Sequence, residues 1–355
     1  MKIDEIDADG RLFIDRLRGF LIFRVILAHL GLSWFYQPYS SYVGMFLPPL
    51  FGISGAVTLY SYYRSDSAMK FIIKRLVTLL TTYYVVVLFG YLFDFISGDN
   101  IKFNVINFLI VNLSPSESPF HISQIWFLRS LVVITIIGLP ALILSKNNIN
   151  YLLIPIVVSF LITLFAFYFD FEKLFFLKFE NIRQVNLYQP IICMGFFFQG
   201  AWMFASKIYK NIRLNFLLFF ILLFFALLWV RFNALSMKLG DHSYYIELYF
   251  YLLGLSAFFL LMSVRKMYSF VLDKFTILNK ILLFFNKHAF AIFLIHSFCI
   301  EISETKLNLI HVSGNLKLLP VKIIFVIVLS SLLAIPLTFV SKAIANKFLS
   351  IISCR

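Results

Sequence analysis

Two ionisable residues in an apolar N-terminal segment are the first candidates for chemistry. Arg18 and His29 flank Gly19 to Ala28, a run that is apolar except for Arg24. In a helix, Arg18 and His29 fall within about 20° of one face and roughly 16 Å apart along the axis, and Arg24 points elsewhere. An ionisable group inside a bilayer costs about 2.5 kcal/mol or more, so such residues are expected to face an interior cavity and to be functional.

The residue types suit two different tasks. A neutral imidazole such as that of His29 acts as a general base near neutral pH. A guanidinium such as that of Arg18 binds phosphate. The structural alternatives are a histidine that bonds to a neighbouring carbonyl in helix packing and an arginine that only anchors the topology. We predict His29 and Arg18 as the catalytic residues.

A second polar stretch follows two adjacent prolines. Pro48 and Pro49 precede Gly52, Ser54 and Gly55 inside an apolar segment. This pattern predicts either a broken helix whose backbone lines a cavity or a close contact between helices.

Later segments add further candidates. Arg75 binds an anionic ligand or extends its charge to the membrane surface. Trp126 belongs either to a site or to an interfacial aromatic belt, and the deeper Arg129 needs a partner, for which we predict Asp94. His296 is expected to line the substrate site. The predicted substrate-binding residues are Arg24, Ser54, Arg75, Trp126, Arg129 and His296.

No metal site is predicted. His288 and His296 fall about 80° apart on a helix. The three cysteines have neither disulfide-like nor zinc-like spacing. They are Cys193, Cys299 and Cys354.

Composition places these residues in a membrane protein. The 355 residues are 61% hydrophobic and 14% charged, and the mean hydropathy is +0.91, outside the range of soluble domains. The net charge of +14 is carried by short connections between apolar runs. The positive charge is therefore interpreted as a determinant of membrane topology and of contact with anionic lipids, rather than as a nucleic-acid-binding surface.

Hydropathy predicts an all-α, polytopic bundle of about ten transmembrane helices. One side of the membrane carries about twice as many lysines and arginines as the other, which favours N-in and C-in orientation. We expect one transmembrane domain over 1–355, with no signal peptide and no appended soluble domain. The external segment 97–121 contains an apolar stretch, 105–113, that is expected to be interfacial or re-entrant, and the external segment 170–187 is expected to lie at the membrane surface. The predicted spans are 16–36, 42–63, 71–97, 122–145, 151–169, 188–206, 212–231, 246–264, 281–300 and 322–348.

Taken together, these stretches resemble the membrane acyltransferase family 3, whose members acylate surface glycans. Arg18, ten residues and His29 match its R-x10-H signature, within Asp15-x-x-Arg18-Gly19. Other landmarks are similar to the family's later motifs: Phe51-Gly52-Ile53-Ser54-Gly55, Lys74-Arg75, Trp126-Phe127-Leu128 and Phe293-Leu294-Ile295-His296.

The chain also departs from the family pattern. Thr78 and Thr81 stand where many members have a second arginine and a proline. Leu131 replaces the glutamate of the W-x-L-x-x-E subgroup, which indicates a subgroup without that acid. The hydrolase-like domain fused to some relatives is not expected here.

The resemblance implies transfer of an acyl group, most often acetyl, from cytoplasmic acyl-CoA to a carbohydrate hydroxyl. No cofactor is expected to be bound; acetyl-CoA is the donor substrate, and the acceptor is an exported or lipid-linked glycan, such as an O-antigen polysaccharide, at the bacterial inner membrane. His29 would be the general base or transient acyl acceptor. The alternative is a glycan-lipid transporter with His29, Arg24 and Arg129 along an aqueous path. No role is assigned to Lys287 or His288.

Overall fold

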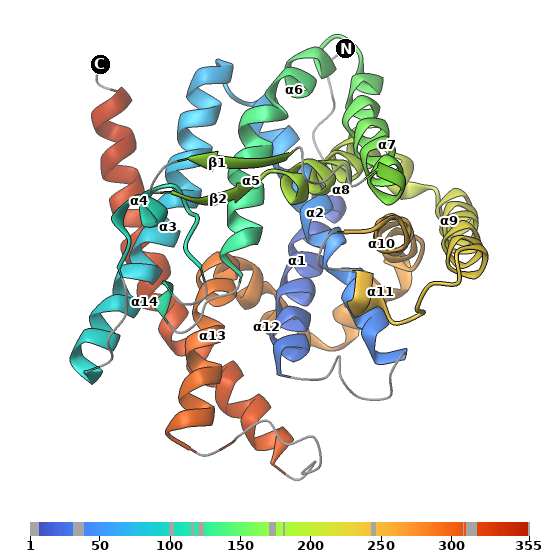
Figure 1. Cartoon of the computed structure of the whole chain (residues 1–355). Coiled ribbons are helices and arrows are strands. Elements are labelled where there is room, and N and C mark those ends of the chain that lie inside the picture. The colour runs from blue at the N-terminus through green and yellow to red at the C-terminus, as the bar shows by residue number, and fades with distance from the viewer. Residues whose placement is uncertain are drawn as a thin grey trace.

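The computed structural model is an all-α fold with one small β-hairpin (Figure 1). It describes residues 7–30, 39–98, 103–114, 117–119, 124–169, 175–179, 182–242, 246–307, 309 and 318–353. The elements are α1 (Ala8–His29), η2 (Tyr39–Phe46), α2 (Pro48–Tyr63), α3 (Ala68–Ser97), α4 (Val105–Leu109), α5 (Ile125–Ile137), α6 (Leu139–Ser145), η4 (Ile149–Leu152), α7 (Leu153–Phe169), β1 (Phe176–Phe179), β2 (Ile182–Asn186), α8 (Tyr188–Ala205), η6 (Ile208–Lys210), α9 (Ile212–Phe232), η7 (Leu239–His242), α10 (Leu248–Ser263), α11 (Arg265–Lys274), α12 (Thr276–Lys287), α13 (Ala289–Thr305) and α14 (Leu319–Ser353).

Helix α1 begins earlier than predicted. The expected start at residue 16 is wrong, because the Asp7 side chain caps the helix and accepts a hydrogen bond from the Gly10 amide at 2.8 Å. Asp7 also forms a 2.6 Å ion pair with Lys210. The helix ends at His29, and residues 31–36 of the predicted span lie outside the described residues.

The prolines of the second predicted span begin a helix instead of kinking it. The 3₁₀ segment η2 ends at Phe46, and α2 starts at Pro48, where a proline loses no intrahelical hydrogen bond. Helix α2 then runs unbroken to Tyr63. The predicted break therefore lies before the small residues, not among them.

In the part of the chain that the structure describes, three pairs of consecutive helices that together are long and apolar enough for a span are bent by more than 40°. The predicted span 122–145 bends by 51° at Gly138, just before Pro140. The helix predicted over 281–300 is divided in two, because α12 and α13 meet at His288 at 91°. Helices α10 and α11 meet at 56°.

Several helices are suited to crossing a membrane. Among the described residues, four helices meet the length and apolarity required on their own, and the three bent pairs raise that number to seven. The other predicted spans coincide with α1, α2 and α8. The number of about ten spans and the N-in and C-in orientation stay predictions.

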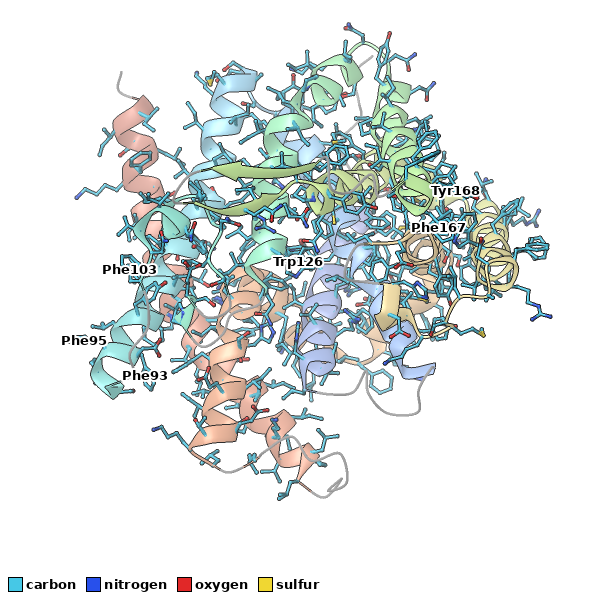
Figure 2. The ribbon with its side chains drawn as sticks, in the orientation of Figure 1. Phe93, Phe95, Phe103, Trp126, Phe167 and Tyr168 are labelled. Atoms are coloured by element: carbon cyan, nitrogen blue, oxygen red, sulfur yellow. The ribbon has the colours of Figure 1, made fainter. Side chains whose placement is uncertain are left out.

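The two segments predicted to be external contain a hairpin and a short helix that hydropathy does not indicate. Part of 170–187 forms an antiparallel hairpin in which Phe176 pairs with Asn186. In the other segment, α4 receives hydrogen bonds from the hydroxyls of Tyr83 and Tyr84 on α3. Figure 2 shows Phe95 and Phe103 at this periphery, and Phe95 is 81% exposed.

Two glycine contacts pack α2 against α8. A Cβ at Gly55 would lie 1.8 Å from the Phe197 carbonyl oxygen, and one at Gly200 would lie 1.9 Å from that of Gly52. Of the two readings of this stretch, close helix packing is the one observed. The glycines thereby leave the opposite side of α2 to face α1.

Helix α12 docks on the other side of α1. The Arg16 guanidinium binds Asp273 at 2.6 Å and Asn279 at 2.8 Å. A Cβ on Gly19 would lie 1.9 Å from the Leu282 carbonyl oxygen, so the two backbones touch there. Helix α1 is thus held between α2 and α12.

A histidine clamp orders the connection between α9 and α10. His242 is buried, with Nδ1 2.6 Å from the Glu247 carboxylate and Nε2 2.7 Å from the Ser236 carbonyl oxygen. The hydrogen bond to Glu247 raises the pKa of this imidazole, against the opposing effect of burial.

Candidate active site

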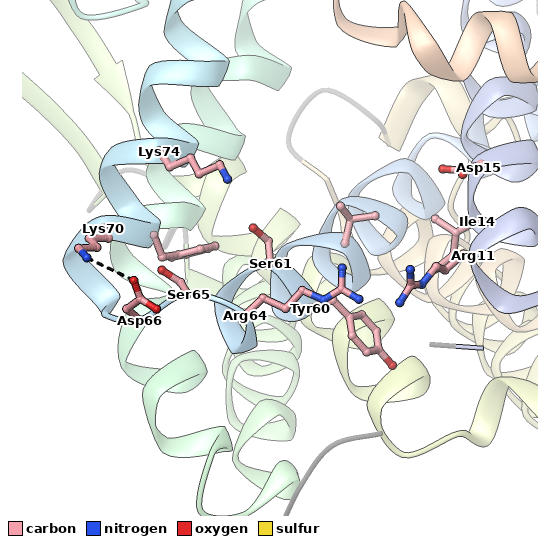
Figure 3. A pocket seen from close by; sticks show the side chains of 12 residues that line it. Arg11, Ile14, Asp15, Tyr60, Ser61, Arg64, Ser65, Asp66, Lys70 and Lys74 are labelled. Carbon is pink, nitrogen blue, oxygen red and sulfur yellow. Dashed lines mark hydrogen bonds and ion pairs between the residues drawn. The ribbon is translucent and has the colours of Figure 1, made fainter. Parts of the chain in front are cut away.

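A charged pocket opens between α1, α2 and α3 (Figure 3). Its volume is about 590 Å³, and we call it the basic pocket. Four cations and two carboxylates line it: Arg11, Arg64, Lys70, Lys74, Asp15 and Asp66. Figure 3 shows Arg11, Arg64 and Lys74 directed toward the space between the three helices. The excess of positive charge suits a polyanionic ligand.

A narrow cavity lies further along α1. It is lined by Arg18 and Ile22 of α1, Ser54 of α2, and aromatic side chains that include Phe127 of α5 and Phe293 of α13. Its free volume is about 10 Å³, which is room for one water molecule. Arg18 is half-buried at this cavity.

Both cavities follow one seam between α1 and α2. On α1, the positions 11, 15, 18, 22 and 29 fall within about 60° of one another around the helix, and residues 11 and 29 are roughly 27 Å apart along it. A stripe with helical spacing runs along α2 to its C-cap Arg64 and also lines the two cavities; it consists of Leu50, Ser54, Val57, Ser61 and Arg64. One continuous face therefore leads from the basic pocket through Arg18 toward His29.

Two histidines meet at the far end of this face. The ring centroids of His29 and His296 are 5.2 Å apart, and we call these residues the histidine pair. His29 is exposed, whereas His296 is fully buried behind it. The side-chain nitrogen of Gln124 lies 3.5 Å from Nε2 of each ring, and its oxygen accepts a 2.6 Å hydrogen bond from Ser297.

An aromatic wall separates the narrow cavity from the histidine pair. The Phe127 ring lies 4.4 Å from that of Phe51 and 4.8 Å from that of Phe293. The Phe293 ring in turn lies 6.1 Å from that of His296. Trp126 lies in the middle of the molecule in Figure 2 and packs 6.2 Å from Phe51.

The structure brings some predicted site residues together and separates others. Arg18 and Ser54 line the narrow cavity, although the Ser54 hydroxyl donates to the Leu50 carbonyl oxygen at 2.9 Å. Arg75 lines neither cavity: its Nε donates to Thr135 at 3.0 Å and its guanidinium lies 5.8 Å from the Phe197 ring. A role of Arg75 in ligand binding stays a prediction.

The remaining predicted arginines lie outside the seam. Arg24 is buried, close enough to His29 for their charges to interact. Arg129 donates to the Asn112 side chain, on the segment that follows α4. Asp94 is buried on α3, and its pairing with Arg129 stays a prediction. His288 is held by Thr338 at 3.0 Å, away from the histidine pair.

Sequence reasoning missed two parts of the site. The first is Gln124, a single amide at the entrance of an apolar helix, which becomes informative only beside the histidines. The second is the basic pocket. Its signal was available, because Arg11 and Asp15 precede Arg18 at intervals of four and three residues and therefore share its face.

Comparison with known proteins identifies the family. A family model described as an acyltransferase domain, acyltransferase family 3, matches residues 11–339. No curated protein and no solved structure shows significant similarity to the chain. The matched range contains the seam, the basic pocket and the histidine pair. Because the match extends over nearly the whole sequence, the chain belongs to the membrane acyltransferase family 3 and is an acyltransferase.

Proposed function

We propose that this multi-pass membrane protein transfers an acetyl or other short acyl group from acyl-CoA to a hydroxyl of a cell-surface polysaccharide or its lipid-linked precursor. The observation that carries the proposal is the seam along α1. It joins a basic pocket at one end to the histidine pair at the other.

The basic pocket suits the nucleotide end of the donor. Coenzyme A carries a diphosphate and a third phosphate on its ribose, and lysine and arginine bind such groups through charge-assisted hydrogen bonds. Arg11, Arg64 and Lys74 are directed into the pocket, while Lys70 is shared with Asp66 at 3.2 Å. The pocket volume of about 590 Å³ lies in the range of small-molecule sites.

The narrow cavity suits the pantetheine arm once it widens. Arg18 stands between the basic pocket and the aromatic wall, so it can hold a phosphate at the start of the arm. The free volume of about 10 Å³ does not admit the arm. Donor binding is therefore expected to displace Phe127 and Phe293, whose rings close the way to the histidine pair.

The chemical step uses His29. Its imidazole takes the proton of the sugar hydroxyl while the hydroxyl oxygen attacks the thioester carbonyl carbon. The carbon–sulfur bond then breaks, and the leaving thiolate receives the proton from the imidazolium. In the second version, His29 accepts the acyl group first and passes it to the hydroxyl. Both versions require an accessible imidazole, and His29 is exposed at the end of α1.

Purified protein in lipid nanodiscs tests the enzyme against the transporter alternative. We expect acetyl-CoA, but not free acetate, to raise the unfolding temperature, because a ligand that binds only the folded state stabilises it. Arg64→Gln with Lys74→Gln should weaken that protection, and Lys347→Gln at the distant end of α14 is the matched control. Equal protection by acetate, or none by acetyl-CoA, contradicts the proposed donor.

The catalytic role of His29 has its own test. His29→Ala should abolish release of free CoA thiol with an acceptor present, whereas His288→Gln, which alters a histidine away from the site, should retain it. Unchanged transfer by a well-folded His29→Ala protein refutes both versions of the mechanism.

The acceptor is tested in cells. We place the protein in the bacterial inner membrane and expect its loss to remove an alkali-labile ester from an intact surface polysaccharide. Mass spectrometry of the glycans before and after mild alkaline treatment measures this. Loss of the polymer itself would favour the transporter.

A further inference from the structure

The Gln124 amide contacts both rings of the histidine pair. We propose that Gln124 is a positioning residue that decides which nitrogen of each imidazole carries the proton. The inference rests on the proposed role of His29. It adds a residue that reaches the reaction only through the two histidines.

The orientation of the amide follows from His296. Its Nδ1 lies 3.2 Å from the carbonyl oxygen of Ile292, which only accepts hydrogen bonds, so Nδ1 carries the proton. In the neutral ring, Nε2 is then an acceptor and must face a donor. The Gln124 NH₂ group meets this requirement at 3.5 Å.

The other end of the amide agrees with that orientation. The Gln124 oxygen lies 2.6 Å from the Ser297 hydroxyl, which donates to it. Both Ser297 and His296 belong to α13, and the side chains of Gln124 and His296 are almost fully buried. The amide is therefore held from one helix at both of its ends.

The second hydrogen of the Gln124 NH₂ group points toward His29. It faces Nε2 of His29 at 3.5 Å, so this nitrogen is also unprotonated and Nδ1 carries the proton. A separation of 3.5 Å is at the outer limit of a hydrogen bond. A sugar hydroxyl can therefore replace this contact and find a lone pair ready to take its proton.

The same donor affects the step that follows. Once Nε2 of His29 has taken the hydroxyl proton, its N–H faces another N–H of Gln124, and this contact is unfavourable. The proton is thereby favoured to leave for the departing thiolate. His296 does not meet the substrate in this scheme, since it is fully buried; it fixes the amide.

Gln124→Glu tests the proposal with nearly the same side-chain shape. A carboxylate only accepts hydrogen bonds, so it favours a proton on Nε2 of His29 and leaves no lone pair there toward the acceptor. We expect kcat to fall about hundredfold or more, as for loss of a general base, with KM for acyl-CoA unchanged. Ser297→Ala, which removes the anchor of the amide oxygen, should give an intermediate loss.

A spectroscopic measurement separates this role from a merely structural one. In protein labelled with ¹⁵N-histidine, nitrogen shifts distinguish the two neutral tautomers among the six histidines. Single substitutions of His29 and His296 provide the assignments. We expect the Nδ1–H form of both rings in the wild type and its loss from His29 in Gln124→Glu. Gln184→Glu on the exposed side of β2 is the control variant.

Two results overturn the proposal: unchanged nitrogen shifts in Gln124→Glu, or changed shifts with kcat within twofold of the wild type. If Gln124→Glu folds poorly, the same two measurements are made on Ser297→Ala. Failure of the proposed function is recognised separately, because His29→Ala would then remain active whatever tautomer the spectra show.

Discussion

Gly55→Ala is expected to damage both the stability of the protein and its reaction. The added Cβ would lie 1.8 Å from the carbonyl oxygen of Phe197, whereas real Cβ atoms essentially never approach closer than 3.0 Å. Helices α2 and α8 must therefore separate by about 1.2 Å. Because the obstacle is backbone and cannot rotate away, we expect a loss of about 3 kcal/mol, the upper end for overpacking.

The direction of this shift links packing to function. Around α2, Gly55 lies roughly 140° from Leu50 and about 100° from Ser54, on the side that contacts α8, so the displacement away from α8 is directed largely toward α1 and the narrow cavity. The cavity has a free volume of only about 10 Å³. We therefore expect kcat/KM for acyl-CoA to fall further than the loss of folded protein explains.

Thiol exposure measures the stability effect. Cys193 on α8 and Cys299 on α13 are buried, so a thiol-reactive fluorophore reports their release on heating. Gly44→Ala is the control, because its Cβ would meet only a Leu239 methyl group at 3.5 Å. If Gly55→Ala unfolds at the wild-type temperature and keeps full activity, the inferred α2–α8 contact is refuted.

Three further predictions concern charge and shape. Because the pKa of His242 is raised in the folded protein, its bond to Glu247 stabilises the connection between α9 and α10 fully below about pH 6.5 and loses this effect as pH rises through the raised pKa. Hydrogen exchange of this connection should increase in that pH range, and Glu247→Gln should remove the pH dependence. Lys210 lowers the pKa of Asp7, so their ion pair contributes to folding stability above about pH 3.8, and this contribution is lost as pH falls through the lowered pKa. In thermal unfolding at neutral pH, we expect Asp7→Ser, which keeps the helix cap, to cost about 0.5 kcal/mol and Asp7→Ala to cost about 1 kcal/mol. Equal costs of the two variants would contradict the role of Asp7 as the helix cap. Phe293→Leu should widen the narrow cavity and raise the ratio of kcat/KM for butyryl-CoA to that for acetyl-CoA about tenfold; an unchanged ratio would show that the acyl chain does not pass Phe293.

The parts of the site that lie on one helix were predictable from sequence. Arg18 and His29 share a face because helical periodicity fixes the angle between residues close in the chain. The partner of His29 was not predictable as such, because His296 comes from α13 and only tertiary packing brings the rings within 5.2 Å. Gln124 was missed for the same reason.

Several element boundaries depend on where the chain breaks or begins a helix, which hydropathy does not measure. Pro48 and Pro49 indicate a break, but whether they kink a helix or begin one depends on where η2 ends. Hydropathy predicts one span across His288 although Asn286, Lys287 and His288 interrupt the apolar run, and the chain turns by 91° there. The docking of α12 on Arg16 accompanies this turn, and it involves residues more than 250 positions away.

The contact of Gly19 with the Leu282 carbonyl fixes the rotation of α1 about its own axis. With its backbone seated on α12, the helix cannot roll about its axis without a steric clash. Arg11, Arg18 and His29 therefore keep a constant register with one another, whichever donor is bound. In the proposed donor site, adaptation to acyl chains of different length is therefore expected in the surrounding walls, on α2, α5 and α13, while α1 keeps its position.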